Sequence, residues 1–173
     1  MNYATIKPCD VANGPGVRVS VFVSGCTHAC KGCFNQVAWD FNYGEAFTQE
    51  TMNYILECLS PSYIRGLTLL GGEPMELVNQ KGILPLLREV KARFPEKDIW
   101  CYTGYMFDHD LVDDMAKKHE ETKEILSYLD VIVDGEFVLE LKNINLRFRG
   151  SENQRIIQVK DSLAKDTIVL WEG

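Results

Sequence analysis

The pattern of hydrophobic and polar positions predicts strands and helices that alternate along the chain. Residues 17–23 (VRVSVFV) are rich in β-branched side chains and follow the turn-forming segment 13–16, which marks the first convincing strand. Apolar residues recur at helical spacing after Thr48, and Pro61 ends that helix. The predicted strands are 17–23, 66–70, 99–102 and 131–133, with one or two more within 155–159 and 167–170. The predicted helices are 48–59, 82–94 and a stretch within 111–129.

The order strand, helix, strand, helix predicts parallel strands joined by right-handed crossovers. The fold class is therefore α/β with a mostly parallel sheet. Ligand sites in such folds lie at the carboxyl ends of the strands, where several loops converge. Unusual loops follow the four main predicted strands, and they contain residues 26–33, 71–74, 103–105 and 134–135. We expect these loops to form one site.

The composition is that of an ordinary globular chain, with 46% hydrophobic and 25% charged residues among 173. That length favours one domain over residues 1–173. The 18 basic and 25 acidic side chains give a net charge of −7, so neither nucleic acid nor a membrane is expected as a partner. The first residues contain no apolar stretch after a basic start, so a cytoplasmic location is expected.

Three of the six cysteines, Cys26, Cys30 and Cys33, lie close together in one predicted loop. Soft thiolates at this spacing suit an iron–sulfur cluster or zinc. A structural zinc site with His28 as fourth ligand is one alternative, and three unconnected small hydrophobic residues are another. A four-iron cluster held by only three cysteines keeps one iron open for substrate.

The remaining cysteines decide whether that iron has a protein ligand. Cys58 lies near Ile55 and Leu59 on the apolar face of a predicted helix, and Cys101 lies within a predicted strand. Both are therefore expected to pack in the core. Cys9 falls in an N-terminal stretch predicted to be irregular, and it stays unassigned.

The cysteine spacing, with Gly71-Gly72-Glu73-Pro74 after the second predicted strand, resembles the signature of the radical S-adenosylmethionine (SAM) superfamily. Longer segments resemble the activating proteins of anaerobic (class III) ribonucleotide reductases. These segments are 13–18, 22–26, 100–105, 133–135 and 149–155, and the resemblance spans about residues 2–160. No role is assigned to residues 161–173.

This resemblance implies that Cys26, Cys30 and Cys33 hold a [4Fe–4S] cluster whose open iron is chelated by SAM. It implies that an electron from the cluster cleaves SAM, and that the 5′-deoxyadenosyl radical so formed abstracts hydrogen from a glycine of the reductase. No side chain of this chain is expected to carry the radical. The implied partner is the large subunit of the anaerobic reductase, and the implied reductant is a protein such as flavodoxin.

The residues implied to contact SAM are Gly32, Cys33, Phe34, Gly71, Gly72, Glu73, Thr103 and Asp134. Glycine lets the backbone approach SAM without a Cβ atom, and Glu73 is expected to accept hydrogen bonds from the SAM ammonium. A plain core role is the alternative for Phe34, and a strand-ending turn is the alternative for Thr103 and Asp134. The polar segment 149–155 either contacts SAM or the partner, or is a solvated loop.

A complete (β/α)₈ barrel needs about 250 residues, so the chain is expected to build a partial, open TIM-like β/α barrel of the radical SAM type. An open side suits a substrate that is itself a protein loop. Two related functions remain open, a radical SAM enzyme acting on a small molecule and an activase of another glycyl radical enzyme such as pyruvate formate-lyase. A zinc or iron–sulfur module without enzymatic activity is the alternative from a different class.

Overall fold

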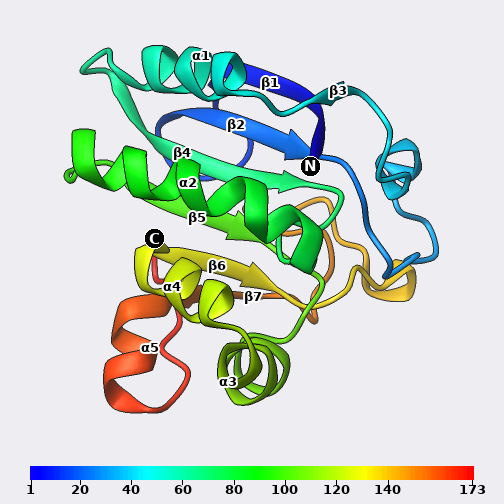
Figure 1. Ribbon diagram of the computed structural model, residues 1–173. Helices are drawn as coiled ribbons and strands as arrows, with labels where there is room; N and C mark the ends of the chain where they lie inside the picture. The colour runs from blue at the N-terminus through cyan, green and yellow to red at the C-terminus, as the bar shows by residue number, and fades with distance from the viewer.

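The computed structural model describes residues 1–173 and contains a seven-stranded sheet in the order β3-β1-β2-β4-β5-β6-β7 (Figure 1). The strands β2, β4, β5 and β6 pair in parallel, whereas β1, β3 and β7 are joined antiparallel at the two sides. The sheet is open, because β3 and β7 form its two edges. The strands are β1 (Asn2–Asp10), β2 (Val17–Val23), β3 (Glu45–Ala46), β4 (Ile64–Gly71), β5 (Asp98–Tyr102), β6 (Val131–Asp134) and β7 (Arg155–Gln158).

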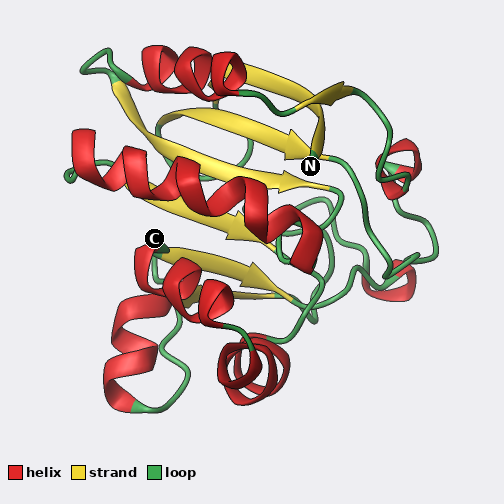
Figure 2. Cartoon of the chain, in the orientation of Figure 1, coloured by secondary structure: helices red, strands yellow, loops and turns green.

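Three main helices connect successive parallel strands. Because these strands are added in one direction along the sheet, right-handed crossovers place all three helices on the same face, as Figure 2 shows. The main helices are α1 (Gln49–Leu59), α2 (Leu77–Arg93) and α4 (Glu120–Tyr128). Shorter elements are 3₁₀ turns at Gln36–Trp39 and Leu139–Leu141, a π-helix at Phe107–Met115, α3 (Ala116–Lys118) and α5 (Val159–Lys165). None of the helices combines the length and apolar character needed to cross a membrane.

The two faces of the sheet differ because side chains alternate along each strand. The helix face, as we name the side covered by α1, α2 and α4, carries the main core. Its strand residues include Val19, Val21, Val23, Leu67, Leu69, Ile99, Cys101 and Ile132, all buried. The opposite side, named the open face, carries the alternate residues, among them Arg18, Ser20, Phe22, Thr68, Leu70, Trp100 and Tyr102.

Loops rather than helices cover the open face. Thr68 donates from its hydroxyl to the carbonyl oxygen of Asn13 at 2.8 Å, which places the loop before β2 over the sheet. Trp100 packs edge-on against Phe148, with ring centres 5.6 Å apart, which places the long loop between β6 and β7 there as well. A cavity lies between these loops and the strands.

The α/β class and the main strands and helices agree with the sequence prediction. The N-terminal stretch is not irregular, since β1 pairs with β2 along most of its length, with two breaks in register that hide its alternation. Helix α2 begins at Leu77, before the predicted residue 82. The helix predicted within 111–129 is interrupted at His119, whose backbone is extended. Segment 167–170 forms only a single bridge to β7 instead of a strand.

Candidate functional site

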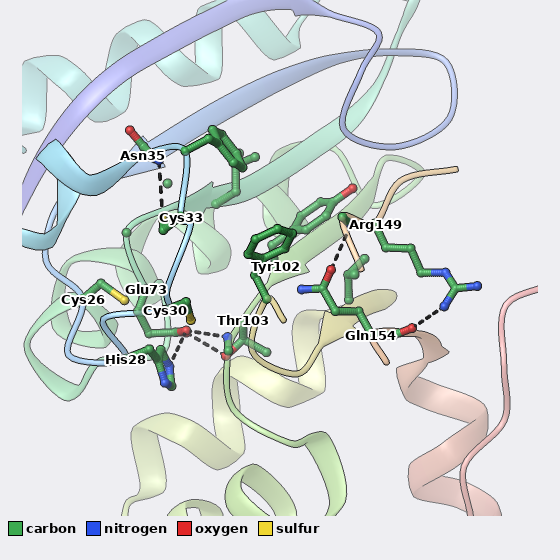
Figure 3. Close-up of a pocket in the computed structure, with 18 of the residues that line it drawn as sticks. Cys26, His28, Cys30, Cys33, Asn35, Glu73, Tyr102, Thr103, Arg149 and Gln154 are labelled. Carbon is green, nitrogen blue, oxygen red and sulfur yellow. Dashed lines mark hydrogen bonds and ion pairs between the residues drawn. The ribbon is translucent and has the colours of Figure 1, made fainter. Parts of the chain in front are cut away.

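The loop after β2 carries the three closely spaced cysteines to the carboxyl edge of the parallel strands. Cys26, Cys30 and Cys33 line one cavity of about 390 Å³ against the open face. Figure 3 shows the three side chains together at one end of it. The segments that follow β2, β4, β5 and β6 all contribute to the lining, so the strand-end loops converge on one site as expected.

Backbone hydrogen bonds fix both ends of the cysteine loop. The Gly25 amide donates to the carbonyl oxygen of Ala38 at 2.7 Å, and the Cys26 amide donates to that of Trp39 at 3.2 Å. The Glu73 amide donates to the carbonyl oxygen of Gly25 at 2.8 Å, which joins the loop to the end of β4. The thiols therefore lie on a closed loop whose base is attached to the sheet.

Gly71 and Gly72 are required by close backbone approach at the base of this loop. A Cβ atom on Gly72 would lie 2.6 Å from the carbonyl oxygen of Gly25 and 2.8 Å from that of Ala38. Gly71 has a φ of +109°, and a Cβ atom there would lie 2.6 Å from the backbone nitrogen of Val23. The glycine pair thus lets separate chain segments meet where the cavity begins.

The buried carboxylate of Glu73 ties several loops together. Its Oε1 accepts from the Thr103 hydroxyl at 2.7 Å and from the Met75 amide at 2.9 Å. Its Oε2 accepts from the Gly104 amide at 2.7 Å and lies 3.0 Å from His28 Nε2. Four protein donors therefore surround the two oxygens expected to receive the SAM ammonium.

His28, between the first two cysteines, is held by two carboxylates. Its Nε2 lies 3.0 Å from Glu73, and its Nδ1 lies 3.0 Å from Glu136. Burial lowers the pKa of His28, but the hydrogen bonds and charges of the two glutamates outweigh burial and raise this pKa to about 9. Both ring nitrogens of His28 are thus engaged by carboxylates. The alternative of a zinc site completed by His28 would require the imidazole to give up one of these two contacts.

The three thiols are free and face a wide space. Burial raises the pKa of Cys26 to about 11 and also raises the pKa of Cys30, so binding a metal centre must release their protons. No group of three or more His, Cys, Asp or Glu side chains is tight enough to hold a single metal ion. Three thiols that line one end of a cavity of this size suit a multi-iron cluster, which is larger than one ion.

Six of the eight residues expected to contact SAM line the cavity, namely Cys33, Phe34, Gly71, Gly72, Glu73 and Thr103. Phe34 is 94% exposed, which excludes the alternative that it is a core residue. The structure therefore brings most of the expected residues to one place.

Gly32 and Asp134 do not line the cavity. Gly32 lies against Leu139, toward which a Cβ atom would point at 2.9 Å. Asp134 is fully buried, and its two oxygens accept from Arg155 at 3.0 and 2.6 Å and from the Phe107 amide at 2.8 Å. These bonds attach β7 and the π-helix to the end of β6, so the Asp134 carboxylate is occupied by structural partners.

The polar segment 149–155 forms one wall of the cavity through Arg149, Gly150 and Gln154. The side-chain oxygen of Gln154 accepts from the amides of Gly150 and Ser151 at 2.9 and 3.1 Å. Arg149 donates to the carbonyl oxygen of Gln154 at 2.7 Å. The segment therefore forms part of the cavity wall and is held by its own hydrogen bonds.

Sequence reasoning missed two residues that shape the site. Asn79 of α2 is fully buried, and its Nδ2 donates to the carbonyl oxygens of Ser24 and Glu73 at 3.0 and 2.9 Å. Tyr102 lies on the cavity floor, where burial raises the pKa of its hydroxyl above the usual range. The signal for Asn79 was an amide on the apolar side of a helix, which requires buried partners.

The other cysteines lie away from the cavity. Cys101 is buried on the helix face, and Cys58 is half-buried on α1 at the margin of the main core. Cys9 is exposed on β1. The cavity therefore holds no fourth thiol.

Comparison with known proteins gives consistent matches along the chain. The profile of a family described as "4Fe-4S single cluster domain" matches residues 12–157. A relative from Enterobacteria phage T4, named anaerobic ribonucleoside-triphosphate reductase-activating protein, is 46% identical over 95% of this chain and 99% of its own length. A relative of the same name from Vibrio cholerae is 44% identical over 90% of this chain and 97% of its own length. Another from Escherichia coli K12 is 40% identical over 89% of this chain and 96% of its own length.

Proposed function

Since this chain belongs to the family of anaerobic ribonucleoside-triphosphate reductase-activating proteins, we propose that it activates its reductase through SAM and a [4Fe–4S] cluster on Cys26, Cys30 and Cys33. The observation that carries this proposal is that all three thiols face one cavity that contains no fourth thiol. When bound, cluster and SAM would supply reductive cleavage to methionine and a 5′-deoxyadenosyl radical, which takes hydrogen from a glycine Cα of the reductase. The electron is proposed to come from a flavodoxin-type protein, in the cytoplasm.

The chain's own residues would hold and orient these groups. The hydrogen bonds at Gly25 and Cys26 would hold the base of the cysteine loop against the sheet while the thiols bind. Gly71 and Gly72 expose backbone to the cavity, where it can pair with the polar end of SAM. Glu73 would receive the SAM ammonium only by exchanging one of its four present donors, so its first role is to fix the loops of His28 and Thr103.

We also propose that the sheet is the partial barrel expected from the chain length. Two features support this interpretation. All three main helices lie on one face (Figure 2), and the cavity lies against the other face, as in a barrel interior. The sheet does not close, and the exposed ring of Phe34 borders the cavity. The gap is proposed to admit the loop of the reductase that carries the reacting glycine.

The test is anaerobic reconstitution with iron and sulfide, followed by reduction in the presence of SAM and the cognate anaerobic reductase. The expected result is formation of 5′-deoxyadenosine together with a glycyl radical signal in electron paramagnetic resonance (EPR) spectra of the reductase. SAM cleavage without a glycyl signal would redirect the proposal to a small-molecule substrate or another glycyl radical enzyme. A protein that holds colourless zinc, or a cluster indifferent to SAM, would instead be a binding module.

A further inference from the structure

The C-terminal segment 167–171 is fastened along the edge of β7. The Gln158 amide donates to the carbonyl oxygen of Val169 at 2.8 Å, and the Trp171 amide donates to that of Ile156 at 2.8 Å. The Val169 amide donates to the buried hydroxyl of Ser162 at 2.9 Å. The segment thereby covers an otherwise open strand edge.

Trp171 enters an aromatic cluster on the open face. Its ring packs edge-on against Trp100, with ring centres 5.1 Å apart, and lies tilted against Phe148, with ring centres 6.0 Å apart. The guanidinium of Arg147 lies 4.7 Å from the centre of the Phe148 ring and 5.8 Å from that of Trp171. Edge-on aromatic contacts and cations over rings are both attractive arrangements. Phe148 is therefore held between the sheet and the C-terminal segment.

Phe148 has an unusual backbone conformation at the cavity wall. Its φ of +60° lies in the left-handed region that non-glycine residues seldom adopt. Such conformations persist only where the surrounding packing enforces them, and they concentrate at functional sites. Phe148, with its neighbours Leu146 and Arg149, lines the cavity that also holds the cysteines. The packing of Phe148 therefore decides where this wall stands.

We propose that Trp171 is a positioning residue for the cavity. By holding Phe148 in its left-handed turn, it fixes the wall formed by residues 146–150, although Trp171 itself does not line the cavity. That this wall borders bound SAM rests on the proposed function. The C-terminal segment, to which the sequence assigned no role, thus acts on the site through one aromatic contact.

The first test compares Trp171→Ala with two matched variants. Trp171→Phe keeps an aromatic ring, and Leu170→Ala changes a neighbouring exposed side chain while leaving the backbone bridge to β7. Hydrogen exchange is measured on the proteins without SAM. The amides of Leu146 and Gly150, which are hydrogen-bonded to Asn143 and Gln154, are expected to exchange about tenfold faster in Trp171→Ala only. Unchanged exchange in that variant would overturn the proposal.

The second test measures the SAM concentration that half-saturates the change in the EPR spectrum of the reduced cluster. At equal iron content, Trp171→Ala is expected to raise this concentration about tenfold, because a displaced wall weakens contacts made elsewhere in the cavity. Trp171→Phe is expected to restore most of the affinity. In a Phe148→Ala background, Trp171→Ala is expected to add little, because the two side chains act as one unit. If the effects of Trp171→Ala and Phe148→Ala on the half-saturating SAM concentration were fully additive, the proposal would be overturned.

The two tests separate this inference from the proposed function. A wild-type protein whose cluster ignores SAM would refute the proposed function, while the exchange comparison would still decide whether Trp171 fixes the wall. A wild-type protein that responds to SAM, with Trp171→Ala indistinguishable from it, would refute only the role of Trp171.

Discussion

The two faces of the sheet are built from the same strands and are stabilised in different ways. The helix face is an apolar layer of Val, Leu and Ile packed under three helices. The open face contains a fully buried Arg18, whose guanidinium donates to Thr68 at 2.8 Å and pairs with Asp98 at 2.6 Å. Loops cover that face and leave a cavity against it. Close packing thus supports the fold on one side, while hydrogen-bonded loops on the other side leave space for a ligand.

Cysteine substitutions are expected to show the largest difference between the two faces of the sheet. Replacing any one of Cys26, Cys30 or Cys33 by Ala removes a ligand proposed for the cluster, so reconstituted protein is expected to lose its cluster and SAM cleavage. Cys101→Ala, on the helix face, is expected to cost about 1 kcal/mol of unfolding free energy and to leave the cluster in place. Iron analysis, absorption spectra and denaturant unfolding measure these outcomes. Cluster loss in Cys101→Ala would contradict the assignment.

Adjacent leucines of β4 give the next largest contrast, because Leu69 faces the helices and Leu70 lines the cavity. Leu69→Ala is expected to lower the free energy of unfolding by about 2–5 kcal/mol, since it leaves a void in a packed core. Leu70→Ala borders space that is already open, so a smaller loss of stability and weaker SAM binding are expected. Denaturant unfolding and SAM titration compare them. Equal losses of stability would show that the two faces are packed alike.

Glu73→Gln is expected to lower stability by an intermediate amount, through the loops on the open face alone. The amide nitrogen of Gln cannot accept from the Gly104 amide, so at least one buried donor loses its partner, at a cost of about 1–3 kcal/mol. The loops that carry His28 and Thr103 should loosen with it. Unfolding experiments and the rate of cluster loss under chelator measure this. A variant as stable as wild type that holds its cluster equally long would argue against Glu73 as the tie between loops.

Asp130 provides the smallest expected effect, at the edge of the sheet opposite the cysteines. Burial alone would raise its pKa, but hydrogen bonds from Lys160 and Lys91 and from the Ile99 amide keep the pKa below its usual value. A lowered pKa in the folded state adds stability above the unfolded pKa of about 3.9, which is lost as the pH falls through the folded pKa. Asp130→Asn is therefore expected to cost about 1 kcal/mol at pH 7 and less in acid. The iron content of the reconstituted protein should not change in this variant. A change would show that the cluster depends on contacts at the opposite edge of the sheet, which would contradict this expectation.

Local patterns in the sequence were sufficient to predict the main strands and helices and the edge of the sheet at which the unusual loops meet. Alternating β-branched residues mark β2 and a continuous buried run marks β4, and strand-end loops must meet at one edge whatever the details of packing. The spacing of Cys26, Cys30 and Cys33 is itself a local feature, and the structure brings these thiols to one cavity.

Contacts between distant segments could not be predicted in the same way. Asp134 looked like a site residue by its place after a strand, but its direction is decided by Arg155, which is 21 positions away. The four donors around Glu73 come from different loops, and Trp171 reaches Phe148 only because its segment pairs with β7. Such partners depend on tertiary packing, which no short pattern encodes.

The central claim is that the open-face cavity holds a three-cysteine [4Fe–4S] cluster with an iron available to SAM. The most direct measurement is the EPR spectrum of the reduced, reconstituted protein before and after addition of SAM. We expect a four-iron cluster signal that changes on SAM addition and is absent from Cys26→Ala, Cys30→Ala and Cys33→Ala. A cluster whose spectrum is the same with and without SAM, or one that survives loss of these cysteines, would contradict the account.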